Sequence, residues 1–145
     1  GAAAIVLFPS ERVIAKPSGD GKKLARLATI ALDAAKQSGR GIVPAVTAED
    51  TFESAIRAAA RAELPIFFYE NERENALYDV LTARGKVKTV SIVTGAEGGF
   101  TPGEAAFAAE CGLVTASLGT RILRCDTAPI AATAVITAVI TAINN

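Results

Sequence analysis

Short continuous hydrophobic runs alternate along this chain with segments in which hydrophobic residues recur at helical spacing. The runs predict strands at residues 2–8, 41–46, 65–69, 89–93 and 113–117. The periodic segments predict helices at residues 22–37, 49–62, 76–83, 101–112 and 126–143. Regular strand–helix alternation is typical of an α/β fold, so we expect a parallel sheet with helices on both faces.

Two loops that contain glycine, at residues 95–102 and 117–128, each follow a predicted strand and lead into a predicted helix. These are called the first and second glycine loops below. In an open parallel sheet, ligands bind in the loops at the carboxyl ends of the strands. Glycine lets main-chain groups approach a ligand because it has no Cβ, although a tight turn would explain the same glycines. The sequence therefore predicts a binding site where the two loops meet.

The segment that follows the first glycine loop carries a helix-start signal. Thr101-Pro102-Gly103-Glu104 places Thr at the N-cap, Pro at the first helical position and Glu at the third. This pattern predicts a capping box. At the other end of a helix, Gly39 predicts where the segment 22–37 stops.

The final predicted helix has no charge between residues 127 and 143 and is apolar on every side. Its length reaches only the lower limit of a membrane span, roughly 17 residues. Its small residues favour close helix packing. We therefore expect a core or dimer helix rather than a membrane span, with Ile136 and Ile140 buried where the helix forms a homodimer interface.

Composition fits one globular domain of 145 residues, of which half are apolar and 21% charged. Two cysteines, Cys111 and Cys125, and the absence of His argue against a zinc site. Reduced thiols in a cytoplasmic protein are the expected state. The chain contains no Met and opens on Gly1, so we expect a fragment of a longer protein.

The net charge is zero, but the two signs are unevenly distributed. Residues 1–40 hold seven Lys/Arg and three Asp/Glu, whereas the remainder holds eight and twelve. Such a basic segment predicts either a phosphate-facing patch or an ordinary solvated surface. The residues of this patch are Arg12, Lys16, Lys22, Lys23, Arg26 and Arg40.

Three segments resemble the RsmE-type 16S ribosomal RNA uridine-N3 methyltransferases. Gly95-Ala96-Glu97-Gly98-Gly99-Phe100 is similar to their GPEGGF loop, and residues 118–128, LGTRILRCDTA, are similar to their LGxRILRxETA segment. Residues 35–40, followed by Val43-Pro44, resemble a third segment that precedes both. The resemblance covers most of the chain in the family's order. It departs from the family at Ala96, Cys125 and Asp126, where the family usually has Pro, Thr and Glu.

The resemblance implies a SPOUT-type α/β fold with a deep C-terminal trefoil knot. It also implies a homodimer in the cytoplasm that binds S-adenosyl-L-methionine and methylates N3 of a uridine in 16S ribosomal RNA of the small subunit. Residues 1–145 would then form the methyltransferase domain, without its first strand–helix unit and without the family's N-terminal PUA-like RNA-binding domain. No metal and no membrane partner are expected.

Cofactor contacts are expected from both glycine loops and from the end of the strand at 65–69. In the family, main-chain groups read the adenine edge and apolar side chains enclose its faces. The residues that fall at these positions are Tyr69, Gly95, Glu97, Gly98, Leu118, Gly119, Ile122, Leu123 and Thr127. For Ile122 and Leu123, core packing is the alternative explanation.

Methylation at uridine N3 requires loss of a proton or stabilisation of the anion. Glu97 and Asp126 are candidate bases, and Arg124 is a candidate cation for the developing charge. Alternatively, Asp126 caps the last helix, or one of the arginines pairs with Asp126 or Glu97. Cys125 is interpreted as a small buried residue and not as a nucleophile.

RNA contacts are expected from Arg12, Arg40 and Arg121. Two other functions remain open at this point. One is another knotted RNA methyltransferase, which acts on the ribose 2′-oxygen. The other is a non-catalytic module that binds nucleotide or RNA with the same loops.

Overall fold

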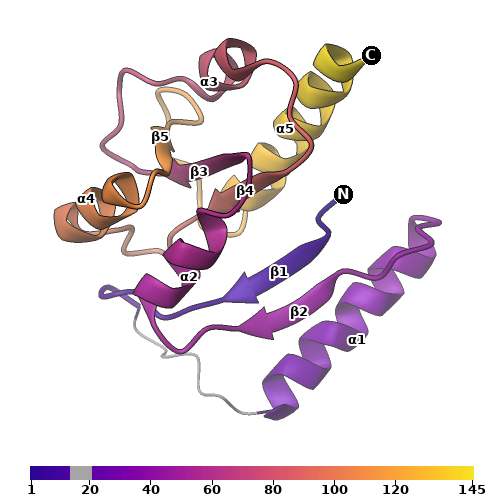
Figure 1. Ribbon diagram of the computed structural model, residues 1–145. Coiled ribbons are helices and arrows are strands. Elements are labelled where there is room, and N and C mark those ends of the chain that lie inside the picture. Colours follow the sequence, from indigo (N-terminus) through magenta and orange to yellow (C-terminus); the bar gives the residue numbers. More distant parts are fainter. Residues whose placement is uncertain (14–20) are drawn as a thin grey trace. The chain divides into compact units, whose positions relative to one another are not determined.

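The computed structural model describes residues 1–13 and 21–145, and it divides the chain into two compact units. The first unit combines Gly1–Pro9 with Ile14–Ala55, and the second combines Ser10–Val13 with Ile56–Asn145. The described strands pair in parallel, which confirms the α/β class. They form one two-stranded and one three-stranded sheet, where the sequence pattern predicted one (Figure 1).

The first unit contains the two-stranded sheet and one long helix. Strand β1 (Ala4–Leu7) pairs with β2 (Ala45–Ala48), with Ala4 opposite Ala45. Helix α1 (Gly21–Gln37) packs on β2 and buries Ala31 and Ala35. The helix ends at a left-handed Gly39, as predicted. Strand β2 begins after Pro44 and not at Gly41, because proline lacks the N–H that a ladder needs.

The second unit is built on the three-stranded sheet. Strand β3 (Leu64–Phe68) lies between β4 (Val90–Val93) and β5 (Val114–Ala116), and all three run in parallel. Phe67 is aligned with Val93 on one side and with Thr115 on the other. Because the strands are parallel, the loops that follow them leave the sheet at the same edge.

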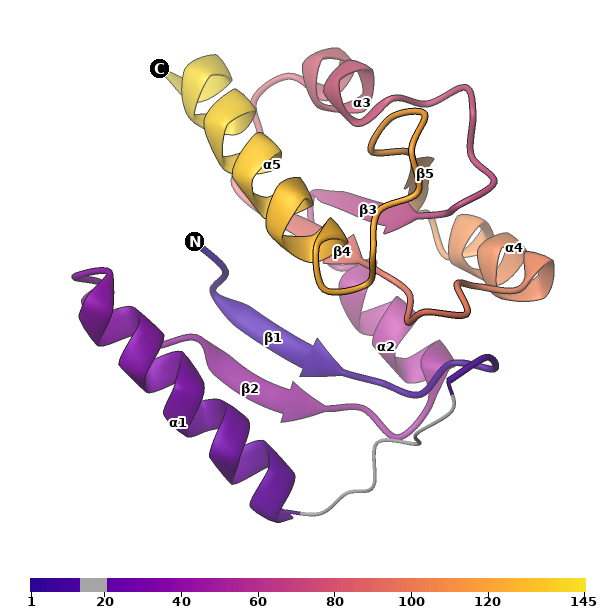
Figure 2. The same ribbon diagram turned by 180° about the vertical axis from the view of Figure 1, so that it is seen from behind.

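Side chains alternate between the two faces of β3, and each face has its own core. One face carries Leu64, Ile66 and Phe68, which pack with residues of α3 (Leu77–Arg84) and α5 (Ala128–Asn144). Phe67 points to the other face, and its ring centroid lies 4.4 Å from that of Phe100. Figure 2 shows α5 crossing in front of the sheet in this unit.

Helix α5 buries one face and exposes the other, although its composition is apolar all round. Ala132 and Ile136 belong to the core cluster, and Ile140 packs against it. Ile136 is thus buried and Ile140 partly buried, but within this unit, where the sequence predicted burial in a dimer interface. Ile130 remains 71% exposed. Across residues 1–13 and 21–145, no helix has both the length and the apolar character that a membrane span needs.

Two further helices follow local signals in the sequence. Helix α4 (Pro102–Glu110) begins with the predicted capping box, in which Glu104 N donates to Thr101 Oγ1 at 3.2 Å and Thr101 N donates to Glu104 Oε2 at 2.8 Å. Helix α2 (Phe52–Ala59) is shorter than predicted and starts after Thr51. The Thr51 hydroxyl accepts from Ser54 N at 3.1 Å, and this hydrogen bond fixes the start.

Candidate functional site

The loops that follow β3, β4 and β5 surround a cavity of about 610 Å³ in the second unit. Both glycine loops contribute to its lining, so they lie together in space as predicted. The loop after β3 is the third contributor, because β3 is the central strand of the sheet. A cavity of this volume falls in the usual range for small-molecule sites.

The first glycine loop is anchored at its end by Phe100. This ring is 1% exposed and stacks at an angle on Phe67 beneath the loop. Gly99 just before it has a φ of +62°, a conformation that favours glycine. The Glu70 carboxylate occupies the space where a side chain at Gly99 would lie. The positive φ therefore favours glycine at this position, and any other residue would also have to displace the Glu70 carboxylate.

Gly98 also lacks room for a side chain, but its neighbour is protein. A Cβ on Gly98 would lie 2.9 Å from Arg12 Cβ and 3.0 Å from Arg12 O. Packing against Arg12 is therefore a reason for glycine at this position besides the cofactor contact that the sequence predicted, and that contact stays a prediction. By contrast, Gly119 in the second loop has a φ of +110° and open space where its Cβ would be. Its main chain can be approached freely.

A hydrogen bond joins the two glycine loops. The Cys125 thiol donates to Glu97 Oε1, with 3.2 Å between sulfur and oxygen. A hydrogen bond from its own backbone N–H, followed by that of the thiol, lowers the pKa of the Glu97 carboxyl. The same carboxylate acceptor, followed by desolvation, raises the pKa of the Cys125 thiol. The thiol is therefore protonated and poorly suited to act as a nucleophile.

Arg124 and Asp126 form an exposed ion pair at the second loop. The distance from Arg124 Nε to Asp126 Oδ1 is 3.7 Å, and the two side chains are 86% and 67% exposed. Asp126 does not cap α5, because the N-cap residue is Thr127 and no side-chain cap hydrogen bond is present. The suggested capping role of Asp126 is therefore wrong. An exposed guanidinium this close to the cavity remains available to a bound anion.

Most of the residues predicted at the cofactor site line the cavity, and Thr127 is outside its lining. Those that line it are Tyr69, Gly95, Glu97, Gly98, Leu118, Gly119, Ile122 and Leu123. Of the predicted catalytic residues, Glu97 and Arg124 line it and Asp126 does not. Their roles stay predictions.

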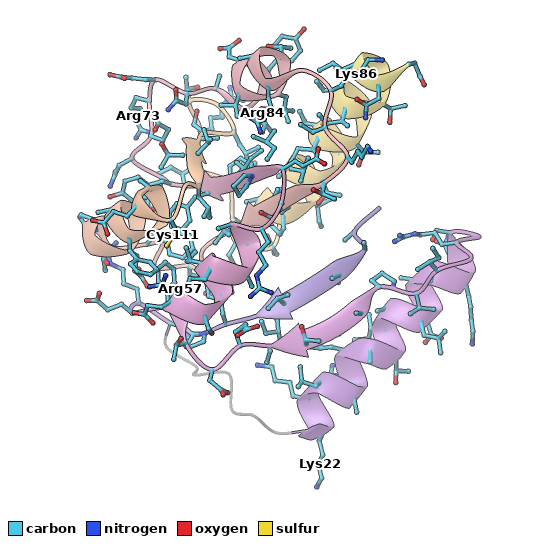
Figure 3. All side chains as sticks on the ribbon, in the orientation of Figure 1. Lys22, Arg57, Arg73, Arg84, Lys86 and Cys111 are labelled. Carbon is cyan, nitrogen blue, oxygen red and sulfur yellow. The ribbon has the colours of Figure 1, made fainter. Side chains whose placement is uncertain are left out.

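The residues predicted to contact RNA are divided between the units. Arg121 lines the cavity. Arg12 belongs to the same unit and contacts the first glycine loop through Gly98 O. Arg40 belongs to the first unit and donates to Ala2 O at 2.8 Å. Lys22, at the start of α1, is labelled in Figure 3. Lys16 lies outside the described residues.

Sequence reasoning missed the contribution of the loop after β3. Its residues Glu70 and Arg73 line the cavity, and Figure 3 labels Arg73 on this loop. The Arg73 guanidinium donates to Glu70 O at 2.7 Å. A polar loop directly after a buried parallel strand is the signal that could have found them.

The loop after β3 is held in place by the Glu72 carboxylate. Its oxygens accept from Thr115 Oγ1 at 2.6 Å, from Glu74 N at 2.8 Å and from Asn75 N at 3.1 Å. These hydrogen bonds, that of Thr115 foremost, lower the pKa of Glu72 from 4.5 to about 2. Thr115 lies on β5, so Glu72 fixes this wall of the cavity to the sheet.

The Glu72 network should make stability depend on pH in an acidic window. Because the folded pKa is lowered, the stabilisation is complete above pH 4.5 and is lost as the pH falls through about 2. After allowance for solvent screening we expect about 1–2 kcal/mol. Urea unfolding of the wild type and of Glu72→Gln should differ by this amount at neutral pH and converge near pH 2. Glu74→Gln is the matched control; an equal effect there would contradict the network.

Among the described residues, no group of three or more His, Cys, Asp or Glu side chains is arranged to hold a metal ion. The cavity instead offers carboxylates, guanidiniums, main-chain groups and an apolar wall. That wall consists of Leu118, Ile122 and Leu123, of which Ile122 is 75% exposed. This combination suits an organic ligand that carries both a flat apolar part and charged groups.

Two relatives with curated names match nearly the whole chain. The ribosomal RNA small subunit methyltransferase E of Synechocystis sp. is 36% identical over 141 residues, which covers 97% of this chain and 46% of that protein. The protein of the same name from Bacillus subtilis is 32% identical over 136 residues, covering 90% and 53%. The chain thus spans about half the length of the curated relatives it matches.

The comparison with solved structures agrees with these matches. A crystal structure of a ribosomal RNA small subunit methyltransferase E from Neisseria gonorrhoeae, bound to S-adenosyl methionine, has a TM-score of 0.82 and 34% identity. The match covers 95% of this chain and 55% of that one. A family model for an RNA methyltransferase domain matches residues 1–137. The resemblance to the RsmE type is thereby confirmed, and the chain belongs to the RNA methyltransferase domain family.

Proposed function

We propose that this chain is the catalytic domain of an S-adenosylmethionine-dependent methyltransferase that acts on N3 of a uridine in 16S ribosomal RNA. The observation that carries the proposal is the cavity between the two glycine loops, because these loops also hold the family motifs. The relatives' names support small-subunit ribosomal RNA as the substrate. The bound cofactor of the Neisseria protein supports S-adenosylmethionine.

The residues around the cavity fit this cofactor. Leu118, Ile122 and Leu123 would hold its flat adenine, and the open main chain at Gly119 would allow close approach. The Glu97 carboxylate, ionised at neutral pH, offers a negative charge to a cationic ligand. Bound here, S-adenosylmethionine would supply an electrophilic methyl group.

Methylation at N3 forms a nitrogen–carbon bond while a sulfur–carbon bond breaks, and the N3 proton must leave. Glu97 is a weak candidate for taking this proton, because its pKa is lowered and its carboxylate already accepts the Cys125 thiol. Arg124 is better suited, since its exposed guanidinium can stabilise the uracil anion as solvent takes the proton. We therefore assign the main catalytic role to Arg124, with Asp126 as its ion-pair partner.

We expect the phosphates of the RNA substrate to contact basic side chains of this chain. Arg121 lies at the cavity, and Arg40 and the basic residues of α1 lie on the first unit. Because phosphate contacts are electrostatic, the affinity for RNA should fall with added salt. A substrate in the small ribosomal subunit supports a cytoplasmic location.

A homodimer and a C-terminal trefoil knot complete the proposed assembly. The family resemblance supports the knot. The homodimer is supported by an uncharged face of α5 that is exposed in this chain and includes Ile130, Ala134, Ala138 and Thr141. Exposed uncharged helix faces of this kind are typical of interfaces.

Titration calorimetry provides the first check on the cofactor. We expect S-adenosylmethionine to bind at one site per chain and ATP not to bind. Ile122→Asp should weaken binding at least about tenfold, because it places a charge in the apolar wall. Ile42→Asp is the matched control, since Ile42 is similarly exposed (73%) but belongs to the first unit. Binding of ATP instead would favour a non-catalytic nucleotide module.

Mapping of methyl groups on ribosomal RNA identifies the reaction. A deletion strain should lose one methyl group at a uridine N3 of 16S ribosomal RNA, and the restored gene should return it. Loss of a ribose 2′-O-methyl group would assign the chain to the alternative knotted methyltransferases.

A further inference from the structure

Residues 10–13, called the strap below, pack in the second unit, although Gly1–Pro9 before them belongs to the first. Glu11 N donates to Glu104 Oε1 at 2.9 Å. Glu104 is buried, and its other carboxylate oxygen accepts within the capping box of α4. The backbone of the strap is thereby fixed to the helix that follows the first glycine loop.

From this fixed position, Arg12 reaches the first glycine loop itself. Its Nη1 donates to Gly98 O at 3.1 Å. The strap lies so close that a Cβ on Gly98 would be 2.9 Å from Arg12 Cβ. Gly98 therefore meets Arg12 through its carbonyl and on the side where a Cβ would lie.

Glu70 connects the same guanidinium to the end of the loop. Arg12 Nη1 lies 3.7 Å from Glu70 Oε1, and Glu70 Oε2 accepts from Phe100 N at 3.4 Å. The Glu70 carboxylate covers Gly99 on the side where a Cβ would lie. Glu70, Gly98 and Gly99 all line the cavity. Arg12 and Glu70 thus hold the loop at two neighbouring points, Gly98 O and Phe100 N.

We propose that Arg12 and Glu70 form a clamp that positions the first glycine loop for its ligand, and that Arg12 is a positioning residue and not an RNA contact. Holding a loop in its binding conformation raises affinity because less freedom is lost when the ligand binds. The identity of the ligand, S-adenosylmethionine, rests on the proposed function. Both side chains are partly exposed, so the clamp should affect local opening more than global stability.

Hydrogen exchange in the ligand-free protein tests the clamp without any cofactor. Arg12→Ala should speed exchange of the amides at residues 95–100 about tenfold, with little change in α4 or in the melting temperature. The exchange rate in Arg12→Lys should lie between those of the wild type and Arg12→Ala, because an ammonium keeps the charge but loses the planar fork of the guanidinium. Arg61→Gln, an exposed arginine after α2, is the control and should match the wild type. Unchanged loop exchange in Arg12→Ala would overturn the proposal.

Titrations with S-adenosylmethionine and with small-subunit ribosomal RNA complete the test. Arg12→Ala and Glu70→Gln should each weaken cofactor binding about fivefold, and the double variant should be little worse than either one. Salt-dependent RNA binding should be unchanged in Arg12→Ala. A lower RNA affinity with unchanged loop exchange would make Arg12 an RNA contact and overturn the clamp. If the wild type fails to bind the cofactor, the proposed function fails, and the exchange result still decides the clamp.

Discussion

Arg124→Ala should lower the rate of methyl transfer roughly a hundredfold, the usual cost of removing one group that stabilises transition-state charge. The melting temperature should stay near that of the wild type, because the side chain is 86% exposed and its only described ion pair is with Asp126. The backbone of Arg124 still accepts from Thr127 N and Ala128 N, so the start of α5 is preserved. The measurement compares single-turnover rates of the wild type and Arg124→Ala on small-subunit ribosomal RNA, with each variant made in the natural full-length protein.

Two matched variants separate charge from shape and catalysis from binding. Arg124→Lys keeps the charge without the planar fork, so it should lower the rate less than Arg124→Ala and leave cofactor affinity nearly unchanged. Arg121→Ala should raise KM for RNA and change kcat little. Near-normal turnover of Arg124→Ala, with loss of activity in Glu97→Gln or Asp126→Asn, would point to a carboxylate base. Equal loss of stability in all these variants would make the second glycine loop structural.

Ile136→Asp should unfold the second unit or destabilise it by several kcal/mol, since it places an unpaired charge in the core cluster. Ile130→Asp, six residues earlier on the same helix, should leave the melting temperature nearly unchanged because Ile130 is largely exposed. If α5 forms the proposed dimer, Ile130→Asp should convert it to a monomer. Thermal unfolding and light scattering distinguish the two effects.

Comparing Ile136→Asp with Ile130→Asp is more informative about the dimer than substituting Ile136 or Ile140 alone. The sequence predicted Ile136 and Ile140 as interface residues, but Ile136 is buried in the core cluster of its own unit and Ile140 packs against that cluster. Loss of the dimer in their variants would therefore report unfolding. A monomeric wild type at high micromolar concentration would contradict the proposed interface, as would a stable dimer of Ile130→Asp.

The order and type of the elements could be predicted from the sequence because they depend on local patterns. Strand β3 is a continuous apolar run, and α1 shows helical spacing with a left-handed Gly39 at its end. The capping box of α4 lies within four consecutive residues, Thr101 to Glu104. The position of the cavity could be predicted as well, since loops at the carboxyl ends of parallel strands share one edge.

Pairings between distant residues were decided by the tertiary structure alone. Which strand lies in the centre depends on packing between elements, and the central position of β3 brings Glu70 and Arg73 to the cavity. Arg12 meets Gly98 across 86 residues, and Cys125 meets Glu97 across 28. A glycine in the sequence is compatible with a turn, a close approach or tight packing, and only the folded chain shows that Arg12 and Glu70 occupy the space at Gly98 and Gly99. Hydrophobic periodicity specifies which face of an element is buried and leaves its partners open, because many neighbours satisfy the same apolar face.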